Sequence, residues 1–165
     1  MDNFRLSFEF FPTKTEEGTK KLYNTRDKLA ALNPDFFSVT YGAGGSTRTN
    51  TIDIVDGLNL KGISTAPHLS CVGESRDSIK DLLNHYAQND VERIVALRGD
   101  LPSGMAASSG ELRYANELVE LIKKEHGDRF HLEVAAYPEM HPQANNYEDD
   151  LLNFKRKVDA GADSA

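Results

Sequence analysis

The feature that most constrains this chain is a repeated pattern in which a short apolar run is followed by a longer segment with helical spacing. Five such runs, rich in aromatic and aliphatic side chains, begin about 30 residues apart, which is the length of one strand–helix unit. They cover residues 6–11, 36–41, 64–70, 94–98 and 131–137. Alternating units of this length form a parallel sheet that is either open or closed into a barrel, so the pattern predicts an α/β fold.

The segments between these runs have apolar stripes that should pack on the sheet. Thr13 and Glu16 have the spacing of a capping box and predict the start of the first helix. Later helices are expected over about 75–88 and 146–160, with Gly161 capping the latter. The expected inner stripes are Leu22, Leu29 and Leu32; Ile79, Leu82, Leu83 and Tyr86; Leu112, Ala115, Leu118, Val119 and Ile122; and Tyr147, Leu151, Phe154 and Val158.

Composition narrows the class of protein and its partners. The 165 residues are enough for one domain with a core, and we expect a single domain over 1–165. The formal net charge of -7 argues against a nucleic acid or an anionic membrane surface as partner. Cys71 is the only cysteine, and no apolar run reaches the ~18 residues of a membrane span. We therefore expect a cytoplasmic protein without disulfides.

Polar residues occur at or near the ends of all five predicted strands. Alternation turns Glu9 away from the phenylalanines on either side of it, so it should point away from the helices. A carboxylate there is unfavourable unless it is partnered or functional. By position, Thr40, His68, Asp100 and Tyr137 should meet Glu9 at the carboxyl edge of the sheet. Five such residues together predict a site at that edge.

The fourth strand runs directly into a charged turn. Alternation predicts one face carrying Ile94, Ala96, Arg98 and Asp100, with Gly99 opening the turn. A strand that delivers charged groups into such a turn is typical of α/β enzymes. The alternative is an ion pair that only closes a surface turn.

Several other patterns have an ordinary structural explanation. The glycine-rich loop at 41–46 lacks the last glycine of a dinucleotide fingerprint, since Thr47 occupies that position. The five histidines lack the spacing of metal ligands, so no metal site is predicted. Asp150, Asn153 and Lys157 lie on one helix face, and by spacing alone this is a solvated face.

Longer stretches of the sequence carry a resemblance. They are SFEFFPTK at 7–14, FFSVTYGAGGSTR at 36–48, APHLSC at 66–71, ALRGDLP at 96–102, AAYPEMHPQA at 135–144 and LLNFKRKVDAGAD at 151–163. With these motifs the chain closely resembles the methylenetetrahydrofolate reductases, flavoproteins of one-carbon metabolism and methionine biosynthesis. The resemblance extends over nearly the whole chain.

The resemblance implies a (β/α)8 TIM barrel that binds FAD without a Rossmann motif. In this family NAD(P)H reduces the flavin, which then passes hydride to 5,10-methylenetetrahydrofolate to give 5-methyltetrahydrofolate. It also implies a homo-oligomer. A complete barrel takes about 250 residues, whereas this chain supplies about five of the eight βα units. We therefore expect a catalytic domain truncated after its fifth unit.

The resemblance also assigns roles to residues. Glu9 matches the general acid that assists opening of the folate ring, and Asp100 matches a carboxylate that contacts flavin and pterin. The implied flavin-binding positions are Thr40, Tyr41, Ala43, His68, Leu97, Arg98, Gly99, Asp100, Ala115, Tyr137, His141, Ala144, Asp150, Asn153, Arg156 and Lys157. Two alternatives stay open: an inactive fragment that at most binds FAD weakly or associates with partner chains, and a lyase that uses Glu9 and Asp100 as acid and base without flavin.

Overall fold

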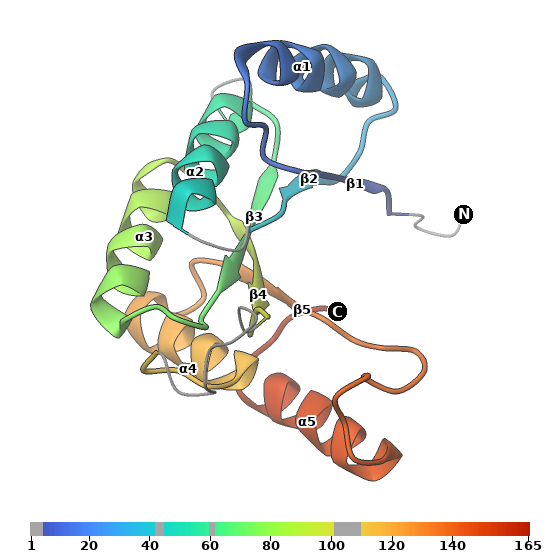
Figure 1. The fold of residues 1–165 in the computed structure, drawn as a ribbon, viewed down its shortest axis with the longest axis vertical. Coiled ribbons are helices and arrows are strands. Elements are labelled where there is room, and N and C mark those ends of the chain that lie inside the picture. Colours follow the sequence, from blue (N-terminus) through green and yellow to red (C-terminus); the bar gives the residue numbers. More distant parts are fainter. Residues whose placement is uncertain (1–4, 42–44, 60–61, 101–109) are drawn as a thin grey trace.

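The computed structural model describes residues 5–41, 45–59, 62–100 and 110–165. Their strands form one parallel sheet in chain order, and a helix follows each strand (Figure 1). The elements are β1 (Ser7–Phe10), α1 (Glu16–Ala30), β2 (Phe36–Val39), α2 (Gly45–Asn59), β3 (Thr65–Ser70), α3 (Arg76–Gln88), β4 (Arg93–Leu97), α4 (Ala115–His126), β5 (His131–Val134) and α5 (Tyr147–Asp159). The α/β fold expected from the repeated pattern is confirmed.

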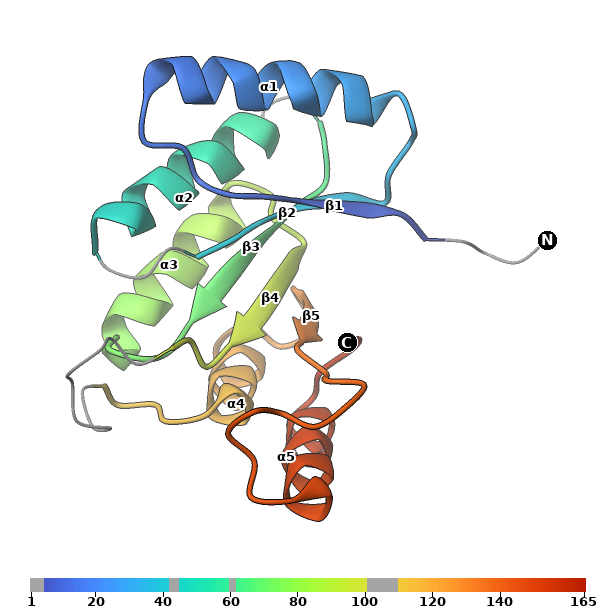
Figure 2. The ribbon, with the colours of Figure 1, turned by 45° about the vertical axis from the view of Figure 1, so that its right-hand side comes forward.

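The strand register defines two different faces of the sheet. Glu9 pairs with Ser38, and His68 pairs with Val95, which in turn pairs with Glu133. These residues share the face that we call the open face, because α1 to α4 follow one another along the other side (Figure 2). Glu9 therefore points away from the helices, as alternation predicted.

The hydrophobic core lies between the sheet and its helices. Phe37 of β2 is fully buried, and its ring stacks against those of Phe8 and Phe10, with centroid distances of 6.0 Å and 5.3 Å. The inner stripe predicted for α3 is confirmed. The stripe predicted for α4 is also confirmed for the residues that lie within the helix, apart from Ala115, which is only partly buried. The buried members are Ile79, Leu82, Leu83, Tyr86, Leu118, Val119 and Ile122. This packing fixes the helices against the sheet and leaves the open face for polar groups.

Two predicted helix starts are wrong by a few residues. Helix α1 is capped by Thr15 and not by Thr13, because Thr15 has an extended backbone and its hydroxyl accepts a hydrogen bond from the Gly18 N–H. The hydroxyl of Thr13 instead bonds to that of Thr19, at 2.7 Å. Leu112 is buried as expected, but it precedes the first turn of α4.

The inner stripe predicted for α5 is also wrong. Tyr147, Leu151 and Val158 are 65%, 69% and 48% exposed, and only Phe154 is partly buried. The helix itself lies where the periodicity placed it, and Gly161 follows its C-cap with a φ of 109°. The periodicity identified an apolar face correctly, but in the described part of the chain no other element covers that face.

The residues after α5 return to the sheet. The backbone N–H of Asp163 donates to the carbonyl of Leu132, and that of Val134 donates to the carbonyl of Ser164, at 2.8 Å and 3.0 Å. Ser164 thereby forms a parallel bridge with Glu133. The outer edge of β5 is therefore partly paired. Among the described residues, no helix is long and apolar enough to cross a membrane.

Candidate functional site

A carboxylate and an imidazole meet on the open face of the sheet. The His68 Nε2 atom lies 3.3 Å from Glu9 Oε2, and the two side chains are 13% and 48% exposed. Burial lowers the pKa of His68, while the carboxylates of Glu9 and Glu133 act in the opposite direction. The contact joins the two site residues that the sequence placed on β1 and β3.

The charged turn after β4 differs from its prediction. Ile94 and Ala96 are fully buried on the helix side, so continued alternation would have turned Arg98 toward the helices. The strand ends at Leu97, and Gly99 has a φ of 85°, which breaks the alternation. The Arg98 guanidinium then reaches the loop after β5 and donates to Gln143 Oε1 at 2.5 Å. Asp100 is exposed at the carboxyl end of β4.

A cleft of about 600 Å³ lies between this turn, the start of α4 and the polar face of α5. Its lining residues are Arg98, Tyr114, Ala115, Asn116, His141, Gln143, Ala144, Asp150, Asn153, Arg156 and Lys157. Eight of these belong to the flavin-binding set implied by the resemblance. We call this space the main cleft. The structure thus brings together half of the predicted set from three separate parts of the chain.

A smaller hollow of about 250 Å³ shares residues with the main cleft. His141, Asp150 and Lys157 line both spaces, and Tyr137 lines only the smaller one. The Tyr137 and His141 rings meet edge to face, with centroids 4.6 Å apart. Tyr137 lies past the end of β5 at Val134, so the loop, and not the strand, determines its position.

The polar face of α5 is organised by specific contacts. Asp150 accepts a hydrogen bond from the backbone N–H of His141, at 2.9 Å, and Arg156 donates to Asn153 at 2.7 Å. Burial lowers the pKa of Lys157, against the opposing effect of Asp150. The solvated face expected from spacing alone is therefore one wall of a cleft.

Other predicted residues lie outside the main cleft. The carbonyl of Thr40 accepts a hydrogen bond from Thr51, and the Tyr41 hydroxyl donates to Glu74 at 3.0 Å. Leu97 is the last residue of β4, and Gly99 and Asp100 follow it. Ala43, with the rest of 42–44 in the glycine-rich loop, falls outside the described residues.

The sequence reasoning missed three residues of the main cleft. Gln143 lies between His141 and Ala144 in a motif that carried the resemblance, and Tyr114 and Asn116 flank Ala115. The residues next to them were identified because they match a family pattern. Gln143, Tyr114 and Asn116 are recognisable only from the geometry of the cleft.

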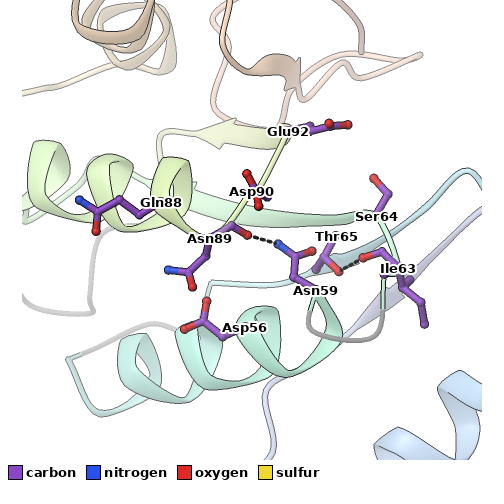
Figure 3. A pocket seen from close by; sticks show the side chains of 10 residues that line it. Asp56, Asn59, Ile63, Ser64, Thr65, Gln88, Asn89, Asp90 and Glu92 are labelled. Carbon is purple, nitrogen blue, oxygen red and sulfur yellow. Dashed lines mark hydrogen bonds between the residues drawn. The ribbon is translucent and has the colours of Figure 1, made fainter.

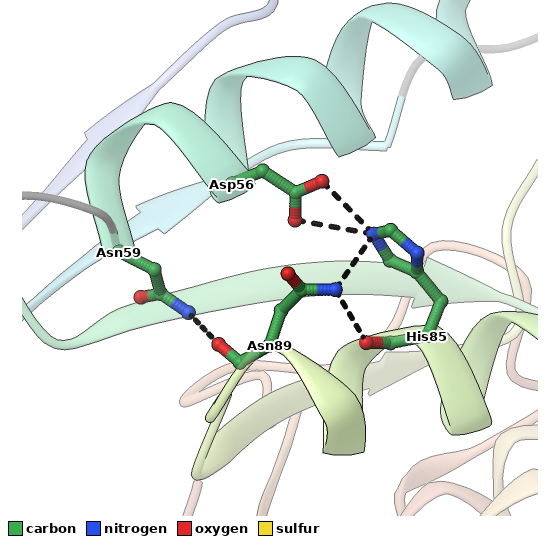
Figure 4. Close-up of polar contacts among 4 residues, drawn as sticks. All are labelled: Asp56, Asn59, His85 and Asn89. Atoms are coloured by element: carbon green, nitrogen blue, oxygen red, sulfur yellow. Dashed lines mark hydrogen bonds and ion pairs between the residues drawn. The ribbon is translucent and has the colours of Figure 1, made fainter.

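A separate hollow of about 430 Å³ lies at the opposite, amino-terminal end of β3 and β4 (Figure 3). At its side His85 contacts both carboxylate oxygens of Asp56, at 2.9 Å and 3.2 Å, and Asn59 donates to the backbone carbonyl of Asn89 (Figure 4). None of the predicted site residues lines it. These contacts tie α2 to α3, which is a structural role typical of that end of a βα barrel.

Consecutive βα units with a carboxylate, an imidazole and a cationic cleft at the carboxyl ends of the strands define an α/β protein of the TIM-barrel class. The described residues contain no cluster of three or more histidine, cysteine or acidic side chains suited to a metal ion. The family model for methylenetetrahydrofolate reductase matches residues 1–165. The chain belongs to the methylenetetrahydrofolate reductase family.

Individual relatives agree with this membership. The chain is 47% identical over 161 residues to the 5,10-methylenetetrahydrofolate reductases of Salmonella typhimurium and Escherichia coli, which covers 97% of this chain and 53% of each relative. It is 39% identical over 171 residues to a protein of Oryza sativa named as a probable methylenetetrahydrofolate reductase (NADH), covering 96% of this chain and 29% of that protein. The chain spans about half the length of the bacterial relatives it matches.

Proposed function

We propose that this chain supplies the proton donor and much of the flavin site of a reductase that converts 5,10-methylenetetrahydrofolate to 5-methyltetrahydrofolate. The observation that carries the proposal is the carboxyl group of Glu9 on the open face of the sheet, beside His68. Substrates of parallel α/β folds bind at the carboxyl ends of the strands. Family membership suggests the reaction, and Glu9 offers a group that this reaction needs.

The reaction needs an acid because the five-membered ring of the folate must open before its bridging carbon can accept a hydride. When the departing ring nitrogen takes up a proton, its bond to the bridging carbon breaks, and that carbon forms an iminium with the other nitrogen. In this proposal Glu9 donates that proton, a step for which a positioned side chain contributes about 10²–10⁴-fold. Asp100, exposed at the end of β4, orients the pterin and faces the positive charge of the iminium.

The main cleft has the chemistry of a dinucleotide site. Arg98, Arg156 and Lys157 bring cationic groups suited to a pyrophosphate, and the amides of Asn153 and Gln143 add hydrogen-bonding groups. FAD is the cofactor in this proposal, and when bound it supplies hydride transfer, with NAD(P)H as the source of electrons. The lowered pKa of Lys157 reflects a partly buried ammonium group, which an anionic ligand would stabilise.

The test uses a full-length hybrid in which this chain is joined to the carboxyl-terminal half of the Escherichia coli relative. Glu9→Gln keeps the size and polarity of the side chain but removes the carboxyl proton. Reduction of methylenetetrahydrofolate should fall by about 10²–10⁴-fold, while reduction of the flavin by NAD(P)H is nearly unchanged. Stopped-flow measurements follow the two half-reactions separately.

Glu125→Gln is the matched control, because Glu125 pairs with Lys80 on the helix side, at 3.0 Å. It should leave both half-reactions at their parent rates. Equal slowing of both half-reactions by Glu9→Gln would mean that Glu9 shapes the site without donating a proton. A hybrid that shows no flavin absorbance after incubation with FAD would favour a lyase or an inactive fragment.

A further inference from the structure

We propose that His68 is a positioning residue for Glu9, holding its carboxyl group and sharing its proton, so that the acid of the site is a carboxyl–imidazole pair. The inference rests on the proposed role of Glu9 as proton donor. It adds a function for His68 beyond the flavin contact that the resemblance implies.

The contact depends on small residues between the two strands. Glu9 lies on β1 and His68 on β3, with β2 between them. The register places Ser38 beside Glu9 and Ala66 beside Ser38, two residues before His68. Short side chains at these two positions leave the path over β2 clear, and the Glu9 carboxyl group reaches His68 Nε2 at 3.3 Å. A larger side chain at position 38 would stand in that path.

The two partners differ in exposure, and this difference determines which of them a substrate can reach. The His68 side chain is 13% exposed, while that of Glu9 is 48% exposed. Burial lowers the pKa of His68 and so favours the neutral imidazole. A neutral imidazole accepts a hydrogen bond from a protonated carboxyl group or donates one to a carboxylate. Glu9 is the more exposed of the two, so its carboxyl group is the one that a substrate nitrogen can reach.

The proton balance of the pair is simple. Glu9 gives its proton to the departing nitrogen of the folate and becomes a carboxylate. One proton from solvent then re-enters the pair, on Nε2 or on Oε2, and either position keeps the hydrogen bond between the two atoms. No oxidant, reductant or further reactant is required for this cycle.

The other charged groups near His68 leave Glu9 as its main partner. Glu133 of β5 also acts on the imidazole, but less strongly than Glu9. The Arg93 guanidinium of β4 pairs with Glu133 at 2.6 Å and so reduces its influence. From β2 the neighbouring side chain on this face is the uncharged Ser38. Among the described residues, the Glu9 carboxyl group is therefore the acidic group most closely coupled to His68.

The first test measures the coupling in this chain by NMR, through the pH titration of the ¹⁵N-labelled His68 imidazole. Glu9→Gln removes the nearest carboxylate, so the midpoint of the His68 titration should shift downward. Asp56→Asn, which removes the carboxylate beside His85 at the other end of the sheet, should leave the His68 midpoint in place. An unchanged His68 midpoint in the Glu9→Gln chain overturns the proposal.

The second test asks whether His68 acts through Glu9, using the full-length hybrid at saturating FAD. His68→Gln should slow the folate half-reaction by up to about 100-fold, the loss expected when a reacting group is displaced by about 1 Å. The pH profile of the folate half-reaction should shift as well, while the rate of flavin reduction changes far less. His85→Gln, the same substitution at the remote pair, should leave rate and profile unchanged.

A double-mutant cycle separates this inference from the proposed function. If His68 acts through Glu9, the double variant Glu9→Gln/His68→Gln should be no slower than Glu9→Gln alone. If the rate loss of the double variant is instead the product of the losses in the two single variants, the role of His68 is overturned while Glu9 remains the acid. If the Glu9→Gln variant instead reduces the folate at the rate of the parent, the proposed function is overturned. The coupling between the two residues would still be measurable by NMR.

Discussion

The ammonium group of Lys157 donates a hydrogen bond to the backbone carbonyl of Ala135, at 2.5 Å, and so fastens α5 to the loop that follows β5. Asp150, two turns earlier on the same helix, accepts a hydrogen bond from the backbone N–H of His141 in that loop. The loop carries Tyr137 and His141 at the border of the main cleft. The polar residues of α5 therefore position a wall of the cleft as well as lining it.

Lys157→Ala should weaken FAD binding about tenfold or more, because it removes a charged hydrogen-bond donor from the cleft and releases the loop at Ala135. Lys155→Ala on the same helix is the control, since Lys155 is exposed and pairs with Asp159 one turn away. Titration of the apo-protein with FAD, followed by flavin fluorescence, measures both. Equal affinities in the two variants would remove Lys157 from the site.

Gly99→Ala should destabilise the protein by about 1–3 kcal/mol. An added Cβ would lie 1.9 Å from Ser70 Oγ, whose hydroxyl is committed to the carbonyl of Arg98, and the backbone φ of 85° is already unfavourable for alanine. Gly62→Ala is the matched control, because Gly62 has a φ of 71°, but within the described part of the chain no atom beyond its chain neighbours lies within 4 Å of the added carbon. It isolates the backbone effect, about 1 kcal/mol. Urea unfolding should therefore show a larger loss at position 99, and equal losses would contradict a steric role for Ser70.

Phe37→Ala should lower the free energy of unfolding by about 3–5 kcal/mol, since it opens a cavity between the rings of Phe8 and Phe10. Leu32→Ala should change it by no more than about 0.5 kcal/mol, because Leu32 is 59% exposed after α1. Chemical denaturation of both variants makes the comparison. A small loss at position 37 would show that this part of the core is loosely packed.

Asp163→Asn should remove a pH-dependent contribution to stability. Burial alone would raise the pKa of Asp163, but the Leu132 N–H and the Lys123 ammonium group outweigh it, and the pKa is lowered. A lowered folded pKa stabilises the protein above the unfolded value of about 3.9, and this stabilisation is lost as the pH falls through the folded pKa. The stabilities of the parent and the variant should differ at pH 7 and become equal at acidic pH.

Thermal unfolding between neutral and acidic pH tests this expectation. Asp159→Asn is the control, since Asp159 is an exposed residue paired within its own helix, and its effect should be small throughout. A constant difference between the Asp163 variant and the parent across the whole range would mean that the carboxylate charge is not the cause.

Local patterns in the sequence were sufficient to predict the helices and strands and the direction in which single side chains point. The repeated units predicted the parallel sheet, and the stripe of α3 is buried as its spacing required. Alternation alone turned Glu9 to the open face. These predictions succeed because helical and strand periodicities are properties of the backbone over a few residues. The motifs also identified the family that the comparisons show.

Contacts between distant segments were decided only by the tertiary structure. The Glu9–His68 pair depends on the register of three strands, and the main cleft depends on how α4, α5 and the Arg98 turn approach one another. The apolar face of α5 was visible in the sequence, but its exposure follows from which elements lie nearby. Periodicity determines which way a side chain points, whereas its partners are determined by the packing of segments far apart in the chain.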